Sequence, residues 1–219
     1  MKKNQIISIF LFTLLGLIAL QIPFTQLLGA NVRFTAFDFI APTMGAFLGT
    51  VPGIISVLIA QLINIGVHGG NPNTGQIIRL FPILFAVFYF AKKRSINLLI
   101  PILAIVAFNL NPIGRSAWQF SLFWLIPIAA HFLRKNLFVR SLGATFTAHA
   151  IGGAIWVWVF GLTKEIWLSL IPVVAIERLA MASGITLFYF VFSKVLHYAA
   201  KTRFSPFLFT SPDQTKKSS

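Results

Sequence analysis

The chain has 219 residues, of which 57% are hydrophobic and only 10% are charged, and its mean hydropathy is +0.85. This composition excludes an ordinary soluble domain, in which about a quarter of the residues are charged. The lack of cysteine excludes disulfides, thiol chemistry and cysteine-ligated metals. Long apolar runs predict instead an all-α, polytopic transmembrane bundle in the cell (inner) membrane. We expect one helical domain over residues 1–200 and a basic, disordered cytoplasmic tail over 201–219.

Eight apolar segments follow one another along the chain. We predict them at residues 6–28, 34–48, 52–67, 77–91, 96–110, 118–133, 142–160 and 166–197. The second, fourth and fifth are only about 15 residues long, whereas roughly 20 are needed to cross a bilayer. The bundle therefore has six to eight membrane segments: either eight crossings, or six crossings and one hairpin that dips into the bilayer.

The net charge of +14 reflects membrane topology. Most of the 18 Lys and Arg residues lie near the N-terminus, in 92–94, in 134–140 and beyond 194. Because cytoplasmic loops are enriched in Lys and Arg, this distribution places both termini in the cytoplasm. Cations confined to loops and ends do not form a nucleic-acid-binding face. The lipid bilayer is an expected partner, and nucleic acid is not.

A glycine ladder, Gly45, Gly49 and Gly53, runs between the second and third segments at a spacing of four. On a single helix this spacing places all three on one face, where two backbones can approach closely. Small residues of this kind mediate helix association in lipid. We therefore predict the ladder as a docking surface for a partner subunit.

Polar residues of the third segment recur at helical spacing. Gln61, Asn64 and His68 lie three and four residues apart, so they share one helical face that ends in the glycine-rich loop 68–75. Asp38 precedes them inside an apolar run, and polar groups at membrane depth face a cavity or a partner. With polar residues of other segments they predict a solute site on the outer side. The candidate substrate-binding residues are Asp38, Gln61, Asn64, His68, Asn109, Gln119, His149 and Glu177.

Two of these candidates lie late in the chain and allow two interpretations. Glu177 is near the middle of the last segment, with Arg178 beside it. Either both residues bond neighbouring helices and lock the bundle, or they line a substrate or coupling surface. His149 is either a ligand contact or a buried hydrogen-bonding group.

Metal binding and catalysis leave weaker patterns in the sequence. His68, with His149 and Asp38, has the imidazole and carboxylate groups that suit divalent metals, but no H-x-x-x-H spacing is present. The chain has no Walker motif, no G-x-S-x-G and no H-E-x-x-H. We therefore predict no ATP hydrolysis by the chain itself, no enzymatic activity and no cofactor.

Three stretches resemble the substrate-binding S components of energy-coupling factor (ECF) transporters. The first, APTMGAFLGTVPG at 41–53, is similar to the glycine-rich hairpin between the early helices of that family. The second is Val67-His68-Gly69-Gly70, and the third, IPVVAIERL at 171–179, is similar to a Pro…Glu helix start near the C-terminus. The last two resemble most the cobalt- and nickel-uptake branch, where the matching histidine is a metal ligand. This makes His68 the candidate metal ligand.

The resemblance implies a subunit that captures a small solute, either a vitamin-like molecule or a divalent metal, on the outer side of the membrane. It also implies a coupling membrane subunit and ATPase subunits as partners. Two other functions are open from the residues alone. A structural or assembly subunit would use the glycine ladder, and an intramembrane lipid-modifying enzyme would use Glu177 and His149 as acid and base.

Overall fold

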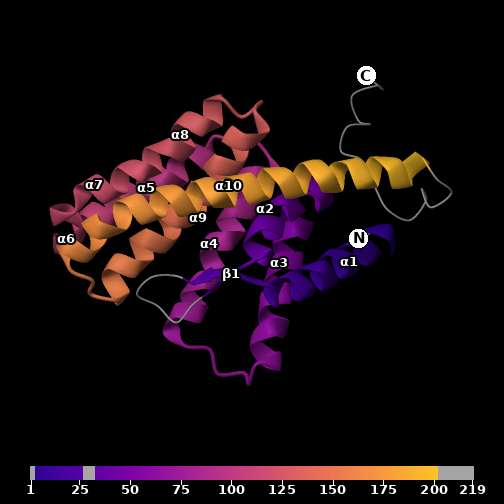
Figure 1. The fold of residues 1–219 in the computed structure, drawn as a ribbon, viewed down its shortest axis with the longest axis horizontal. Coiled ribbons are helices and arrows are strands. Elements are labelled where there is room, and N and C mark those ends of the chain that lie inside the picture. Colours follow the sequence, from indigo (N-terminus) through magenta and orange to yellow (C-terminus); the bar gives the residue numbers. More distant parts are fainter. Residues whose placement is uncertain (1–2, 27–32, 202–219) are drawn as a thin grey trace.

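The computed structural model describes residues 3–26 and 33–201, and these are almost entirely α-helical (Figure 1). The prediction of an all-α chain is confirmed. The predicted tail lies outside the described residues except for Lys201, which ends the last helix. Residues 27–32, which include the last two residues of the predicted segment 6–28, also lie outside them.

Long helices account for most of the fold, and a shorter broken run separates two of them. The long helices are α1 (Lys3–Leu20), α2 (Phe37–Leu48), α3 (Thr50–Val67), α4 (Thr74–Ala91), α5 (Ile96–Leu110), α9 (Leu137–Val159) and α10 (Lys164–Lys201). The broken run consists of α6 (Pro112–Ser116), α7 (Trp118–Ser121), the 3-10 turn η1 (Leu122–Trp124) and α8 (Leu125–Phe132). The start of α1 and the end of α10 lie toward the same end of the molecule, on the right in Figure 1.

A short hairpin between α1 and α2 differs from the sequence prediction. Strands β1 (Pro23–Gln26) and β2 (Arg33–Thr35) pair antiparallel, with an irregularity after Pro23. The predicted first segment, 6–28, is therefore too long, and the second segment begins later than predicted. Proline has no backbone N–H and restricts its own φ, which favours the end of α1 before Pro23. Pairing with β2 is a long-range contact that an apolar run does not reveal.

Within the described residues, four helices are long and apolar enough to cross a membrane: α3, α4, α9 and residues Lys164–Tyr198 of α10. Large apolar side chains also cover the exterior. Phe10 is 67% exposed, Val67 76% and Ile176 70%. Side chains of this kind are stable when they face lipid, whereas in water such a surface would promote association. Length, composition and surface together are those of a helical membrane protein.

Two apolar clusters form the core, and the two longest helices connect them. The first cluster gathers residues of α1, α2, α3 and α4 with the second half of α10. The other gathers residues of α5 to α9 with the first half of α10. Helix α9 contacts α4 as well as α5 and α8, and α10 contacts both α2 and α9 (Figure 1). Spaces between the clusters are therefore enclosed by helices from distant parts of the chain.

Two arginines near the α8–α9 connection complete the hydrogen bonding of α4. Arg134 Nη2 donates to the carbonyl of Phe90 at 2.8 Å, and Arg140 Nε donates to the same oxygen at 2.7 Å. The last carbonyls of a helix have no partner within it, and cations are favourable there. Burial, aided by the charge of Arg140, lowers the pKa of Arg134 to about 10, so the group stays charged at neutral pH.

The glycine ladder does not lie on one helix face. Gly49 has a φ of +92°, and the helix breaks there, so Gly45 belongs to α2 and Gly53 to α3. A Cβ added to Gly53 would lie 2.6 Å from the Cα of Gly45, because the two backbones touch. Both glycines are buried within the chain. The close approach of Gly45 and Gly53 is therefore made within the chain, and docking of a partner at the ladder stays a prediction.

We expect Gly53→Ala to destabilise the protein by about 1–3 kcal/mol, as overpacking of a tight contact does. The matched control is Gly66→Ala in the same helix, where an added Cβ meets nothing within 4 Å. That change should be neutral or stabilising by up to about 1 kcal/mol. Thermal unfolding in a mild detergent measures both, and equal effects of the two substitutions would contradict the contact.

Candidate solute-binding site

A polar cavity of about 410 Å³ lies among the end of α1, the end of α3 and the beginnings of α2 and α4. Its polar lining comes from three helices (α2, α3 and α4), from β2, and from the residues that directly follow α1 and α3. The polar residues that line it are Gln21, Thr35, Asp38, Gln61, Asn64, His68, Gln76 and Arg79. Four predicted site residues, Asp38, Gln61, Asn64 and His68, thus line one cavity.

Local hydrogen bonds hold the side chains of this polar cavity in place. Asn64 Oδ1 accepts from Gln21 Nε2 at 2.8 Å, which joins α3 to the end of α1. His68 Nδ1 lies 2.8 Å from the carbonyl of Asn64. Because a carbonyl only accepts, Nδ1 carries the proton, and Nε2 of a neutral ring is left as an acceptor. On the facing helix, Asn73 and Gln76 form a reciprocal capping box at the start of α4.

An aromatic cavity of about 160 Å³ lies deeper, between the two apolar clusters. It is enclosed mainly by α2, α4, α9 and α10, and α7 adds one side chain. Its aromatic lining residues are Phe34, Phe120, Trp156 and Trp167. Asp38, His149 and Glu177, all predicted site residues, also line it. The two cavities share Asp38, Arg79 and Ile83, so these three side chains lie between them.

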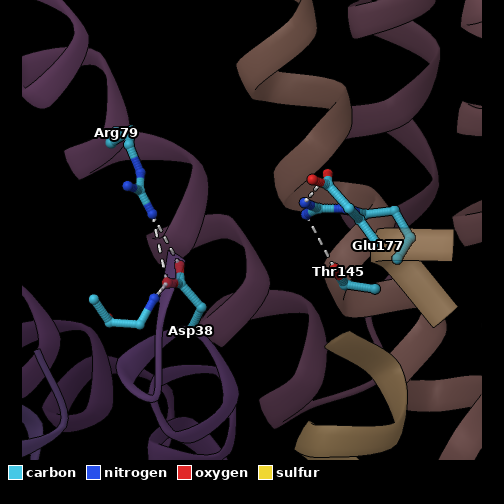
Figure 2. A network of polar contacts seen from close by, with 6 residues as sticks. Asp38, Arg79, Thr145 and Glu177 are labelled. Carbon is cyan, nitrogen blue, oxygen red and sulfur yellow. Dashed lines mark hydrogen bonds and ion pairs between the residues drawn. The ribbon is translucent and has the colours of Figure 1, made fainter. Parts of the chain in front are cut away.

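An ion pair joins α2 to α4 at this boundary (Figure 2). Arg79 Nη2 lies 3.4 Å from Oδ1 of Asp38, and the side chains are 26% and 15% exposed. Asp38 Oδ2 also accepts from the backbone N–H of Thr35 at 2.8 Å. Asp38 is in the first turn of α2, where the helix dipole favours a carboxylate. One side chain therefore fixes the hairpin, α2 and α4 relative to one another.

A second ion pair lies within α10, and its arginine also bonds to α9. Arg178 Nη2 lies 3.5 Å from Oε2 of Glu177, and Arg178 Nη1 donates to Oγ1 of Thr145 at 3.3 Å. Figure 2 shows Glu177 beside Thr145, on helices different from those of the first pair. Glu177 therefore pairs with its neighbour on the same helix, Arg178 alone bonds to α9, and both residues line the aromatic cavity.

Phe34 connects the two ion pairs. The guanidinium carbon of Arg79 lies 5.0 Å from the centroid of the Phe34 ring, and that of Arg178 lies 4.9 Å from it. Cations within about 6 Å of an aromatic face are attracted by its negative quadrupole. A single ring of strand β2 thus contacts a cation from each half of the site.

His149 has a defined protonation pattern. Its Nδ1 accepts from Trp124 Nε1 at 3.1 Å. Because an indole N–H can only donate, Nδ1 holds a lone pair, and the neutral ring carries its proton on Nε2. The ring also lies 5.3 Å from that of Phe120, measured between centroids. His149 is therefore a partly buried hydrogen-bonding group that also lines the aromatic cavity.

The structure does not bring every predicted residue to the site. Asn109 donates to Ile105 O and to Ser121 Oγ, which ties α5 to α7. Gln119 is exposed on α7. Neither residue lines either cavity, so the structure does not bring them to the other predicted site residues. The reason is tertiary: they belong to the α5–α8 side of the second cluster, away from the two ion pairs.

The predicted three-residue metal site is not formed. His68 lines the polar cavity and His149 lines the aromatic cavity, so the two imidazoles do not meet. Within residues 3–26 and 33–201, no three His, Asp or Glu side chains come together as a group that could hold a metal ion.

Several residues of the site escaped the sequence analysis. Phe34 falls in the second predicted apolar segment, and Arg79 and Trp167 are not among the predicted site residues, yet all three line the aromatic cavity. A charge count holds one usable signal. The chain has only four acidic residues, and two of them lie within apolar segments, so each needs a cation: Asp38 finds one on another helix, and Glu177 pairs with the adjacent Arg178.

Searches against protein-family models, curated proteins and solved structures find no match to this chain. The class of protein therefore follows from the fold and composition alone. It is an α-helical bundle with helices long and apolar enough to span a membrane, which encloses two adjoining cavities.

The first ion pair can be measured by a double-mutant cycle of Asp38→Asn and Arg79→Gln. Each single change should cost about 1–3 kcal/mol, because it leaves a partly buried polar group without its partner. The double variant should cost less than the sum by about 1 kcal/mol, the coupling expected of groups in contact. Denaturant unfolding in detergent gives these free energies.

The control cycle combines Asp38→Asn with Arg115→Gln, since Arg115 is exposed and does not line either cavity. Those two changes should be additive. Additivity of the Asp38 and Arg79 changes would instead show that their contact contributes nothing to stability.

Proposed function

We propose that the chain is the membrane-embedded capture subunit of an ECF-type uptake transporter, which crosses the cell membrane several times and has both termini in the cytoplasm. The observation that carries this proposal is the pair of adjoining cavities, one polar and one aromatic, that share three lining residues. A solute would enter the polar cavity, pass the boundary formed by Asp38, Arg79 and Ile83, and bind in the aromatic cavity.

The state of the ionisable groups favours binding over catalysis. The carboxylates of Asp38 and Glu177 each contact a guanidinium, and His149 Nδ1 accepts from an indole. General acid–base catalysis needs a group within reach of the substrate proton and able to exchange its own. Glu177 and His149 are both engaged in these contacts, so the alternative of a lipid-modifying enzyme lacks a free acid and a free base. The assembly alternative loses its support because Gly45 and Gly53 are buried inside the chain.

The solute we propose is a vitamin-like small molecule. The metal alternative loses support because the described part of the chain has no group of three His, Asp or Glu side chains. Since the sequence contains no nucleotide-binding motif, uptake against a gradient would need ATPase subunits and a coupling membrane subunit as partners.

The proposed topology makes a direct prediction for single cysteines introduced into this cysteine-free chain. Asn71→Cys and Arg115→Cys should react with a membrane-impermeant maleimide in intact cells. Lys93→Cys should react only after the cells are permeabilised. All three positions are exposed, so access to reagent and not burial decides the result. Labelling of residue 71 only after permeabilisation would invert the arrangement and refute capture from outside.

The proposed function predicts what accompanies the chain when it is purified in mild detergent. Mass spectrometry should find an ATPase, a second membrane protein and a small organic molecule that the chain does not alter. Ile83→Trp should lower recovery of the small molecule by more than about tenfold, equivalent to about 1.4 kcal/mol, because the larger side chain fills the boundary between the cavities.

The matched control is Ile77→Trp, an exposed position on the same helix that lines neither cavity. It should leave recovery unchanged. Concentrative, ATP-driven uptake by the chain alone in liposomes would refute the proposal that separate ATPase and coupling subunits power transport. If the Ile83→Trp variant elutes and unfolds like the wild type but recovers as much of the small molecule, binding of the solute beyond this boundary is refuted.

A further inference from the structure

Two hydrogen-bond donors in the lining of the aromatic cavity lack acceptors. Arg178 Nε and Trp167 Nε1 are both buried, and neither has a hydrogen-bond partner among the described residues. Arg178 is 6% exposed and Trp167 3%. A buried donor left without a partner costs about 1–3 kcal/mol, so such groups are rare unless a ligand supplies the acceptor.

His149 adds a third donor to the same cavity. Its Nδ1 accepts from Trp124, so the proton of the neutral ring lies on Nε2, and no hydrogen bond from that nitrogen is found in the described part of the chain. The three donors come from α9 and α10, which enclose the cavity. A ligand there must therefore present acceptors along the edge that faces these two helices.

The charges of the cavity are already balanced. Arg79 is paired with Asp38 and Arg178 with Glu177, and both pairs line the cavity. A charged ligand would bring an additional charge into an apolar bundle, where an uncompensated ion is costly. The arrangement thus favours a ligand that accepts hydrogen bonds without carrying a net charge.

The remaining walls favour a flat ring. Phe34, Phe120 and Trp167 line the cavity, and the rings of Phe120 and Trp167 are in edge-on contact at 4.7 Å between centroids. Aromatic side chains gain most from contact with other rings in stacked or edge-to-face geometry. Aliphatic residues such as Val174 and Ile185 complete the enclosure.

We propose that the aromatic cavity recognises an uncharged aromatic or heteroaromatic ring compound whose edge carries hydrogen-bond acceptors. Arg178 Nε, Trp167 Nε1 and His149 Nε2 donate to that edge, and the aromatic side chains contact the faces of the ring. This inference rests on the proposed function, because it names the class of solute that the capture subunit binds.

A matched set of two-ring probes tests the inference without knowledge of the natural solute. Coumarin is uncharged and carries acceptors, naphthalene has no acceptor, coumarin-3-carboxylate is an anion and 1-methylquinolinium is a cation. Binding to the full chain in lipid nanodiscs is followed by ligand-observed NMR, with empty nanodiscs to subtract partition into lipid. Coumarin should bind at least about tenfold more tightly than each of the other three.

Two variants assign that preference to the donors. Trp167→Phe keeps a ring but removes Nε1–H, and Arg178→Lys keeps the charge but removes Nε. Each should weaken coumarin binding by about fivefold, the effect of one lost hydrogen bond, and leave naphthalene binding unchanged. Trp118→Phe is the control, because Trp118 is exposed on α7 and lines neither cavity; it should bind coumarin like the wild type.

Failure of the inference and failure of the proposed function give different results. Equal binding of naphthalene and coumarin, tightest binding of a charged probe, or no binding of any probe overturns the inference. So does unchanged coumarin binding in the Trp167→Phe variant. If coumarin is preferred as expected but no solute and no ATPase accompany the purified chain, the ligand class stands and the transport role fails. If a charged solute is recovered with an ATPase, the transport role stands and the inference fails.

Discussion

The site depends on the ion pair between Asp38 and Arg79. In a bundle with an apolar exterior, an unpaired charge at depth is costly, so a carboxylate there requires a cation beside it. This pair joins α2 to α4, and the same carboxylate accepts from the backbone of Thr35. The beginning of α2, the hairpin and α4 are therefore held together at one point. That point is also the boundary between the polar and the aromatic cavity.

Phe34 extends this arrangement to the other half of the site. Its ring contacts the guanidinium of Arg79 and that of Arg178, which pairs with Glu177 and donates to Thr145. Each half of the site thus has balanced charge, and one aromatic side chain lies between the two cations. This explains how a chain with so few acidic residues keeps two guanidinium groups inside its core.

The location of the aromatic cavity follows from how the two apolar clusters meet. Helices α2 and α4 belong to the first cluster, α7 belongs to the second, and α9 and α10 contribute to both. Neither cluster could enclose a ring-shaped solute alone. The polar cavity, in contrast, is lined by α2, α3, α4, the hairpin and the residues around the ends of α1 and α3. The two cavities differ in chemistry because different helices line them.

The sequence by itself determined the all-α class, the apolar segments and the shared polar face of Gln61, Asn64 and His68, because composition and helical periodicity are local properties. It also singled out Asp38 and Glu177, since acids are rare in apolar runs. Tertiary structure decided which groups they meet: Arg79 is 41 residues from Asp38 in sequence, and no spacing rule connects them. It also separated Asn109 from the site, broke the glycine ladder at the positive φ of Gly49, and placed Phe34 in a strand. These features depend on long-range backbone pairing and helix packing, which local patterns do not encode.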